Sequence, residues 1–247
     1  MTPAARERAQ VRTPVLFISA AAWILLVAGP GGTALSAHCP PAMAASLKLL
    51  LAVNPPAVLA AGWALMLAAM MAPMLIAPVR HVRDSSFARR RARAIMLFVA
   101  GYAAVWMAAG AMLMALALAV RLAAPESWLV VALGTVIALV WQFSPFKQRC
   151  LNRGHAHFEL AAFGVAADIG ALRFGLTHGV WCVGSCWALM LLPLLVSRGH
   201  VAAMAAVSLW LFAERFDTPM PPRWRLRGPG RAARIVIAQA QMRLERS

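Results

Sequence analysis

Long uninterrupted apolar blocks, separated by short polar connections, constrain the fold of this chain more than any other feature. The blocks lie near residues 14–36, 57–79, 94–120, 127–146, 172–196 and 199–216. A helix needs about 20 residues to cross the hydrocarbon layer of a membrane. Hydrophobic residues make up 62% of the chain, above the roughly 45–50% of soluble globular proteins. The sequence therefore predicts an all-α, polytopic transmembrane helix bundle of about six spans.

The basic residues indicate the orientation of this bundle. Of the 24 Lys and Arg residues, 21 lie in the N-terminus, the second and fourth connections and the C-terminal tail. Positive charge concentrates on the cytoplasmic side of membrane proteins, so both termini are predicted to be cytoplasmic. Orientation also accounts for the net charge of +16, and no nucleic-acid partner is expected. The arginine-rich second connection is expected to face the anionic inner leaflet of the bilayer.

The predicted domain organisation has three parts. Residues 1–13 form a cytoplasmic N-terminus, 14–216 the transmembrane domain, and 217–247 a basic Pro/Arg-rich cytoplasmic tail with a candidate amphipathic helix. An alternative for the first block is a signal peptide cleaved after "ALSA". Within the second block, Pro73 cannot donate to the Ala69 carbonyl, which predicts a kink.

One apolar stretch, "THGVWCVGSCWALMLL" at 177–192, carries four metal-binding side chains at steps of four residues: His178, Cys182, Cys186 and Met190. Such residues lie on one helix face, about 6 Å apart along the axis. One ion cannot bind them all, because His178 and Cys186 are about 12 Å apart. Adjacent pairs are able to share an ion if another helix completes the shell. Thiolate, thioether and imidazole ligands favour copper(I), with zinc as the alternative.

The second block offers the completing ligands. Met66, Met70 and Met74 also recur at steps of four. If this helix is antiparallel to the cysteine helix, Met74 lies level with His178, Met70 with Cys182, and Met66 with Cys186. The alternative is ordinary packing, since Cys and Met are common core residues.

Weaker candidate ligands occur at both ends of the bundle. Cys150, His155 and His157 are predicted near the inner boundary, and His38 and Cys39 on the outer side. A disulfide between Cys182 and Cys186 is disfavoured because both project from one rigid helix.

Two other residue pairs are interpreted as structural. Tyr102 and Trp106 are assigned to helix packing, and Glu214 with Arg215 to a local ion pair at the inner boundary. No phosphate-binding glycine motif is present, and neither a nucleotide nor haem is implied as a cofactor. We expect a non-enzymatic protein, with thiol redox chemistry as the alternative.

Four motifs carry a resemblance to a known family: "WALMLAAMMAPM" (63–74), "GYAAVW" (101–106), "WQFSPFKQRCL" (141–151) and "GLTHGVWCVGSCWALM" (175–190). Across about residues 57–216 the chain resembles bacterial integral membrane proteins described as predicted metal-binding, whose domain function is otherwise uncharacterised. The resemblance implies a multi-pass protein of the bacterial inner (cytoplasmic) membrane that binds metal. This chain departs from the family pattern at Ser185 and Gly154, where relatives often carry further cysteines.

The leading hypothesis is therefore a membrane protein that handles copper(I) by binding, delivery or passage along a His/Cys/Met ladder. Expected partners are a membrane subunit or a metal donor or acceptor. A non-catalytic scaffold or assembly subunit, whose Cys/Met stripe only packs, is the main alternative, and a membrane thiol redox enzyme is the next.

Overall fold

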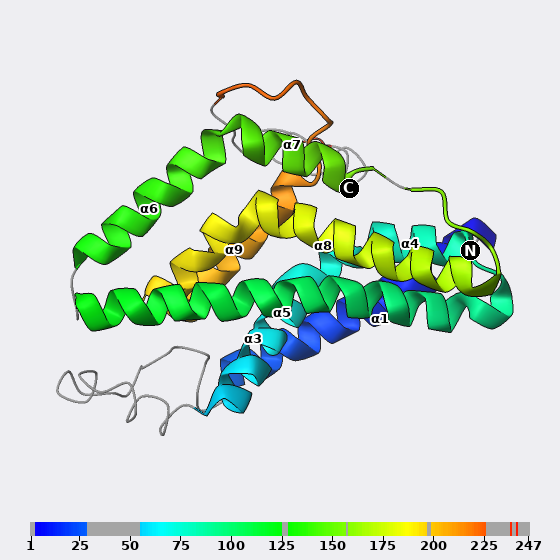
Figure 1. Cartoon of the computed structure of the whole chain (residues 1–247), viewed down its shortest axis with the longest axis horizontal. Coiled ribbons are helices and arrows are strands. Elements are labelled where there is room, and N and C mark those ends of the chain that lie inside the picture. The colour runs from blue at the N-terminus through cyan, green and yellow to red at the C-terminus, as the bar shows by residue number, and fades with distance from the viewer. Residues whose placement is uncertain are drawn as a thin grey trace.

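The computed structural model describes residues 3–28, 55–124, 128–156, 158–196 and 199–225, together with Ala238 and Gln241. These residues form helices and no strand (Figure 1), so the all-α class is confirmed for them. The helices, in chain order, are α1 (Pro3–Ala28), α3 (Pro56–Met71), η2 (Ala72–Leu75), α4 (Ile76–Asp84), η3 (Ala88–Arg90), α5 (Arg91–Ala123), α6 (Trp128–Phe143), α7 (Pro145–Gly154), α8 (Gly164–Leu195) and α9 (His200–Glu214).

Four helical segments of the described chain are long and apolar enough to cross a membrane: Ala9–Ala28, Pro56–Asp84, Ala88–Val120 and Gly164–Leu195. Helices α6 and α7 pass the same test only as a pair, and they are bent by 64°. Helix α9 is apolar but has only 15 residues. Length and composition therefore support four spans, or five if the bent pair is one, rather than all six predicted.

The bend between α6 and α7 is encoded at Ser144 and Pro145. Pro145 occupies the first turn of α7, where the missing N–H removes no helix hydrogen bond. The Ser144 hydroxyl caps α7 by accepting a hydrogen bond from the backbone N–H of Lys147 at 3.1 Å. The chain thus starts a new helix directly after α6, in a different direction.

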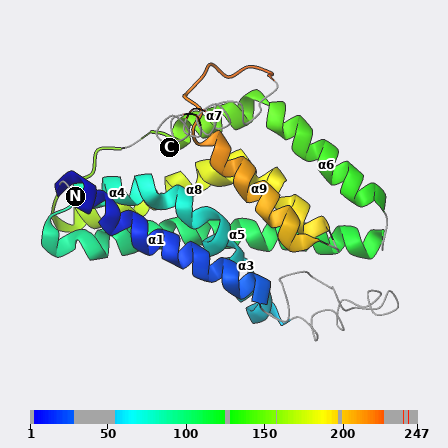
Figure 2. The same cartoon turned by 180° about the vertical axis from the view of Figure 1, so that it is seen from behind.

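Helices α5 and α8 form the most extensive contact of the fold and run in the same direction (Figures 1 and 2). Their backbones approach closely because glycines occupy the interface. A Cβ at Gly101 would lie 2.6 Å from the Leu172 carbonyl oxygen, and one at Gly175 would overlap the Phe98 carbonyl. Small residues allow such close packing between membrane helices. This interface fixes the register between the two helices.

The α-helix is interrupted where the kink was predicted, at Pro73. Helix α3 ends at Met71, and the next turn, η2, is a 3₁₀ helix that contains Pro73. In a regular helix the N–H of residue 73 would bind the Ala69 carbonyl. Here the hydroxyl of Ser19 on α1 donates to that carbonyl at 2.6 Å. Helix α1 therefore satisfies the polar group that the proline leaves open.

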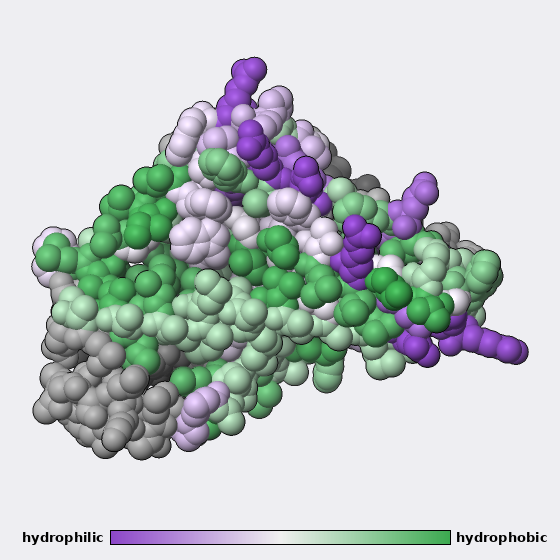
Figure 3. Space-filling model, in the orientation of Figure 1, coloured by the Kyte–Doolittle hydropathy of each residue, from purple (hydrophilic) through white to green (hydrophobic). Residues whose placement is uncertain are grey.

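On the face shown in Figure 3, hydrophilic residues gather at the N-terminal ends of α5 and α8 and around α7, whereas apolar side chains cover the surface between them and toward the other end of the bundle. Asp168 at the start of α8 binds Arg90 and Arg93, each at 2.7 Å. Part of the arginine cluster that we assigned to lipid thus holds two helix ends together. Among the outward side chains, Phe17, Met112 and Trp128 are each at least 74% exposed.

The beginning of the C-terminal tail packs on α7. Asn152 donates to the Met220 carbonyl at 2.7 Å and accepts from the Met220 N–H at 3.2 Å. The N–H of Arg225 binds the Phe143 carbonyl at 3.3 Å. The amphipathic helix predicted over 231–247 falls outside the described residues, apart from Ala238 and Gln241.

Candidate metal centre

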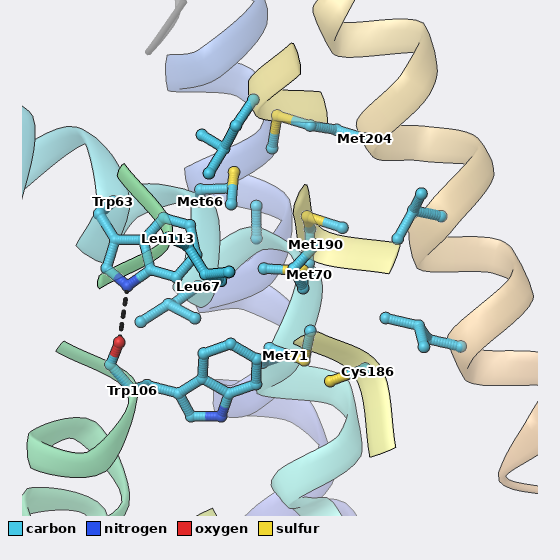
Figure 4. Close-up of a cluster of buried hydrophobic side chains, with 14 of the residues drawn as sticks. Trp63, Met66, Leu67, Met70, Met71, Trp106, Leu113, Cys186, Met190 and Met204 are labelled. Carbon is cyan, nitrogen blue, oxygen red and sulfur yellow. Dashed lines mark hydrogen bonds between the residues drawn. The ribbon is translucent and has the colours of Figure 1, made fainter. Parts of the chain in front are cut away.

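The core between α3, α5, α8 and α9 is rich in sulfur. Figure 4 shows methionine side chains from three helices converging on one another and on Cys186. The buried sulfur residues of this cluster are Met66, Met70, Met71, Cys182, Cys186, Met190 and Met204. We call this set the sulfur cluster. Thioethers and thiols are ligands for soft metal ions.

The two cysteines of the sulfur cluster lie one turn apart on α8. Cys182 is 1% exposed and Cys186 2%, and neither forms a disulfide. The Cys186 thiol donates to the Cys182 carbonyl at 2.9 Å. Ser185, which stands where relatives often carry a cysteine, donates its hydroxyl to the same carbonyl at 2.7 Å. The pair is a buried dithiol on one helix face.

Helix α5 presents an aromatic stripe to the cysteines. Phe98, Tyr102 and Trp106 follow one another at steps of four and are all buried. The Tyr102 hydroxyl lies 3.3 Å from the Cys182 sulfur, whereas Trp106 packs against Trp63 on α3, with their ring centroids 6.2 Å apart. Both residues belong to the buried core, as their interpretation as packing residues implies, and Tyr102 in addition contacts a candidate ligand.

The methionines of α3 do not meet α8 in the predicted order. In the view of Figure 4, Met71 lies level with Cys186 and Met70 with Met190, and all four belong to the sulfur cluster. The prediction instead paired Met70 with Cys182 and Met66 with Cys186. The side chains of α3 are thus shifted along α8, and Met71, outside the predicted triplet, approaches a cysteine.

Met74 leaves the predicted stripe because of the break in its helix. It lies in η2 and is only half-buried, at the border of the sulfur cluster. A 3₁₀ turn advances about 120° per residue, against about 100° in an α-helix. Side chains beyond Met71 are therefore rotated away from the line that joins Met66 and Met70.

His178 is enclosed by aromatic rings. It is 4% exposed, and its ring centroid lies 6.0 Å from those of Phe98 and Tyr102 and 5.9 Å from that of Phe174. In the described part of the chain, no three His, Cys, Asp or Glu side chains come close enough to hold a metal ion. His178 thus does not join Cys182 and Cys186 in a three-ligand site.

A buried ion pair lies beside the cysteines. Lys147 on α7 is fully buried and contacts the Glu214 carboxylate on α9 at 2.8 Å. Gln142 bonds to both partners, and the Trp210 indole donates to Glu214 at 3.0 Å. The predicted local pair of Glu214 with Arg215 is therefore wrong, because Lys147 binds the carboxylate.

Arg215 instead faces the cysteines. Its Nη2 atom lies 3.7 Å from the Cys182 sulfur. The guanidinium passes close to Gly154 on α7, where a Cβ would lie 3.1 Å from Nη1. Because Arg215 is half-buried, it connects the buried dithiol with the surface near α7.

The weaker candidate ligands do not join this site. Cys150 packs against the backbone of Gly184, which lies on the face of α8 opposite the cysteine pair. The His155 ring bonds to the Leu151 carbonyl at 2.8 Å. His38, Cys39 and His157 lie outside the described residues.

The donor set determines which ion the cluster suits. Two thiols surrounded by thioethers match copper(I). A structural zinc site needs four ligands from Cys, His, Asp or Glu, and the described residues contain no cluster of even three. The zinc alternative is therefore not supported. The site residues that sequence reasoning missed were Met71, Tyr102 and Arg215, and of these only Tyr102, through its spacing with Trp106, gave a signal in the sequence.

Comparison with known proteins agrees with this chemistry. The family model PpoB2, described as copper chaperone, matches residues 60–236, a range that contains the whole sulfur cluster and the Lys147–Glu214 pair. No curated protein and no solved structure matches the chain significantly. The match covers most of the chain, which therefore belongs to the PpoB2 family of copper chaperones.

Proposed function

We propose that this protein is an integral membrane copper(I) chaperone that binds its cargo with the Cys182–Cys186 dithiol and adjacent methionines. The observation that carries the proposal is a buried, disulfide-free cysteine pair inside a methionine-rich core. Copper(I) prefers these soft ligands, and the surrounding core excludes competing water. The family membership supports copper as the cargo.

The surface of the bundle supports placement in a membrane. Large apolar side chains point outward from α1, α5 and α6, among them Phe17, Met112 and Leu133, each more than 60% exposed. Contiguous exposed apolar surface of this kind marks a membrane or protein contact. Extraction of native membranes with carbonate tests this placement separately: the protein should remain in the pellet, and release into the supernatant would contradict it.

The sulfur cluster also supports a path for cargo movement within the protein. From the cysteine pair, the cluster continues through Met190 on α8 to Met204 on α9 (Figure 4). Thiolates bind copper(I) more strongly than thioethers do, so the dithiol is the storage position and the methionines form a weaker exit or entry row. Delivery requires a partner protein that offers ligands at the end of this row.

The test is the copper content of purified protein. Wild type, a Cys182→Ser/Cys186→Ser double variant and a Cys150→Ser control are loaded anaerobically with copper(I) from a chelator and analysed by mass spectrometry. Wild type and control should retain stoichiometric copper, and the double variant should lose it. Equal copper in the double variant would contradict the proposal. Absence of copper from wild type, with a membrane partner still co-purifying, would favour the scaffold alternative.

A further inference from the structure

We propose that Arg215 makes the Cys182–Cys186 dithiol prefer a monovalent over a divalent metal ion. The inference rests on the proposed function, copper(I) binding by these two cysteines. The Arg215 guanidinium lies 3.7 Å from the Cys182 sulfur, and its charge acts on both cysteines. Arginine stays protonated at any physiological pH, so this charge is permanent.

The second cation beside the dithiol does not contribute in the same way. Lys147 acts electrostatically on Cys186, but the Glu214 carboxylate binds it at 2.8 Å and neutralises it. Arg215, by contrast, forms no ion pair with any carboxylate in the described ranges. The dithiol therefore faces one net positive charge.

The balance of charge distinguishes the two classes of ion. Two thiols that bind Cu⁺ release two protons and form a bis-thiolate complex of charge −1. Two thiols that bind Zn²⁺ also release two protons, but their complex is neutral. The copper complex is thus one unit more negative than the zinc complex, whatever the protonation state of the free cysteines. Arg215 neutralises the first complex and leaves the second with a net charge of +1.

Burial converts this difference into selectivity. Cys182 and Cys186 are at most 2% exposed, and an uncompensated charge in such surroundings is strongly unfavourable. An opposite charge within about 4–6 Å shifts a protonation equilibrium by about 1–3 pKa units, a factor of about 10 to 1000. We expect Arg215 to favour copper(I) over zinc by a factor within this range. A methionine-rich shell adds to the preference through softness, but it does so independently of charge.

The experiment compares copper(I) and zinc affinities by chelator competition in the full-length protein. Arg215→Gln and Arg215→Met remove the charge, Arg215→Lys keeps it, and Arg149→Gln removes an exposed arginine that contacts Phe146. The two neutral variants should lower the copper-to-zinc affinity ratio by about tenfold or more, chiefly through weaker copper binding. The Lys variant and the Arg149 control should stay near wild type. Using two neutral variants keeps the test valid if one of them does not fold.

The outcomes separate the two proposals. If wild type binds copper(I) through the cysteines and the neutral variants keep its copper-to-zinc ratio, the role of Arg215 is refuted while the chaperone function stands. If Arg215→Lys loses as much selectivity as Arg215→Met, the shape of the guanidinium matters rather than its charge, and the inference also fails. If wild type binds no copper(I), the proposed function itself is refuted.

Discussion

The hydroxyl oxygen of Tyr102 on α5 lies 3.3 Å from the sulfur of Cys182 on α8. The two residues are 80 positions apart in the chain, and they meet because glycines bring the backbones of α5 and α8 together. The contact links the packing of the bundle to the candidate copper site. Substitutions at the site should therefore change copper binding, and substitutions in the helix interface should change stability.

Replacing Tyr102 with Phe should weaken copper(I) binding without changing its stoichiometry. The hydroxyl is able to donate to the Cys182 thiolate, and a hydrogen bond to a charged group contributes about 1.5–3 kcal/mol. Loss of one such bond corresponds to about a tenfold or larger rise in the dissociation constant, measured by chelator competition. Ser185→Ala is the matched control, since it removes a neighbouring hydroxyl that bonds only to a carbonyl. An equal loss in both variants would argue against a role for the Tyr102 contact.

Met71→Leu and Met74→Leu should differ in their effect on copper. Both substitutions conserve volume and cost little packing energy, but Met71 is buried in the same cluster as Cys186, whereas Met74 is half-buried at its border. We expect Met71→Leu to raise the rate at which copper(I) is lost to a chelator, and Met74→Leu to leave that rate unchanged. A faster loss of copper(I) from Met74→Leu than from Met71→Leu would contradict this expectation and favour the Met66–Met70–Met74 stripe predicted from sequence.

Gly175→Ala should destabilise the whole bundle. Its Cβ would overlap the Phe98 carbonyl, so α5 and α8 would have to separate, at a cost of about 1–3 kcal/mol for an overpacked contact. Thermal unfolding in detergent should show a lower midpoint. Gly170→Ala is the control because its Cβ would meet only the Leu160 side chain, at 3.6 Å. A midpoint that falls equally in both variants would mean that close helix contact is not the cause.

Lys147→Met should lower stability by about 3–5 kcal/mol, because it leaves the Glu214 carboxylate buried without its cation. The double variant Lys147→Met/Glu214→Gln should recover part of this loss, since no unpaired charge remains. Arg80→Met removes one member of the exposed Arg80–Asp84 pair and should change stability by less than about 1 kcal/mol. Denaturation curves of the four proteins test the ordering, and a double variant less stable than Lys147→Met would contradict it.

The helical class was predictable from the sequence because an apolar block of about 20 residues is long enough to cross a membrane as a helix. The number of spans was less predictable: six were expected, and the described residues support four or five. The last block, 199–216, is long enough on paper, but the helix begins after Gly199, whose φ of 78° lies in the left-handed region, and ends at Glu214. Such local backbone changes shorten a helix without altering its apolar composition.

The candidate site was predictable along each helix but not between helices. Steps of four residues identified the α8 stripe correctly as one face, because that spacing is a property of the helix itself. The partners of that face depend on register, which the glycines of α5 and α8 and the break at Pro73 determine. Glu214 and Arg215 show the same limit. Neighbours in sequence point about 100° apart on a helix, so Glu214 binds Lys147 while Arg215 faces Cys182.

The hydrogen bond from Ser19 to the Ala69 carbonyl has a consequence for the movement of α3. That oxygen depends on a side chain from a different helix, so α3 is unable to slide along α1 without leaving a bare acceptor in apolar surroundings. The methionines of α3 are thereby anchored to the N-terminal helix. Loss of α1 would therefore leave the Ala69 carbonyl without the donor that replaces the proline N–H.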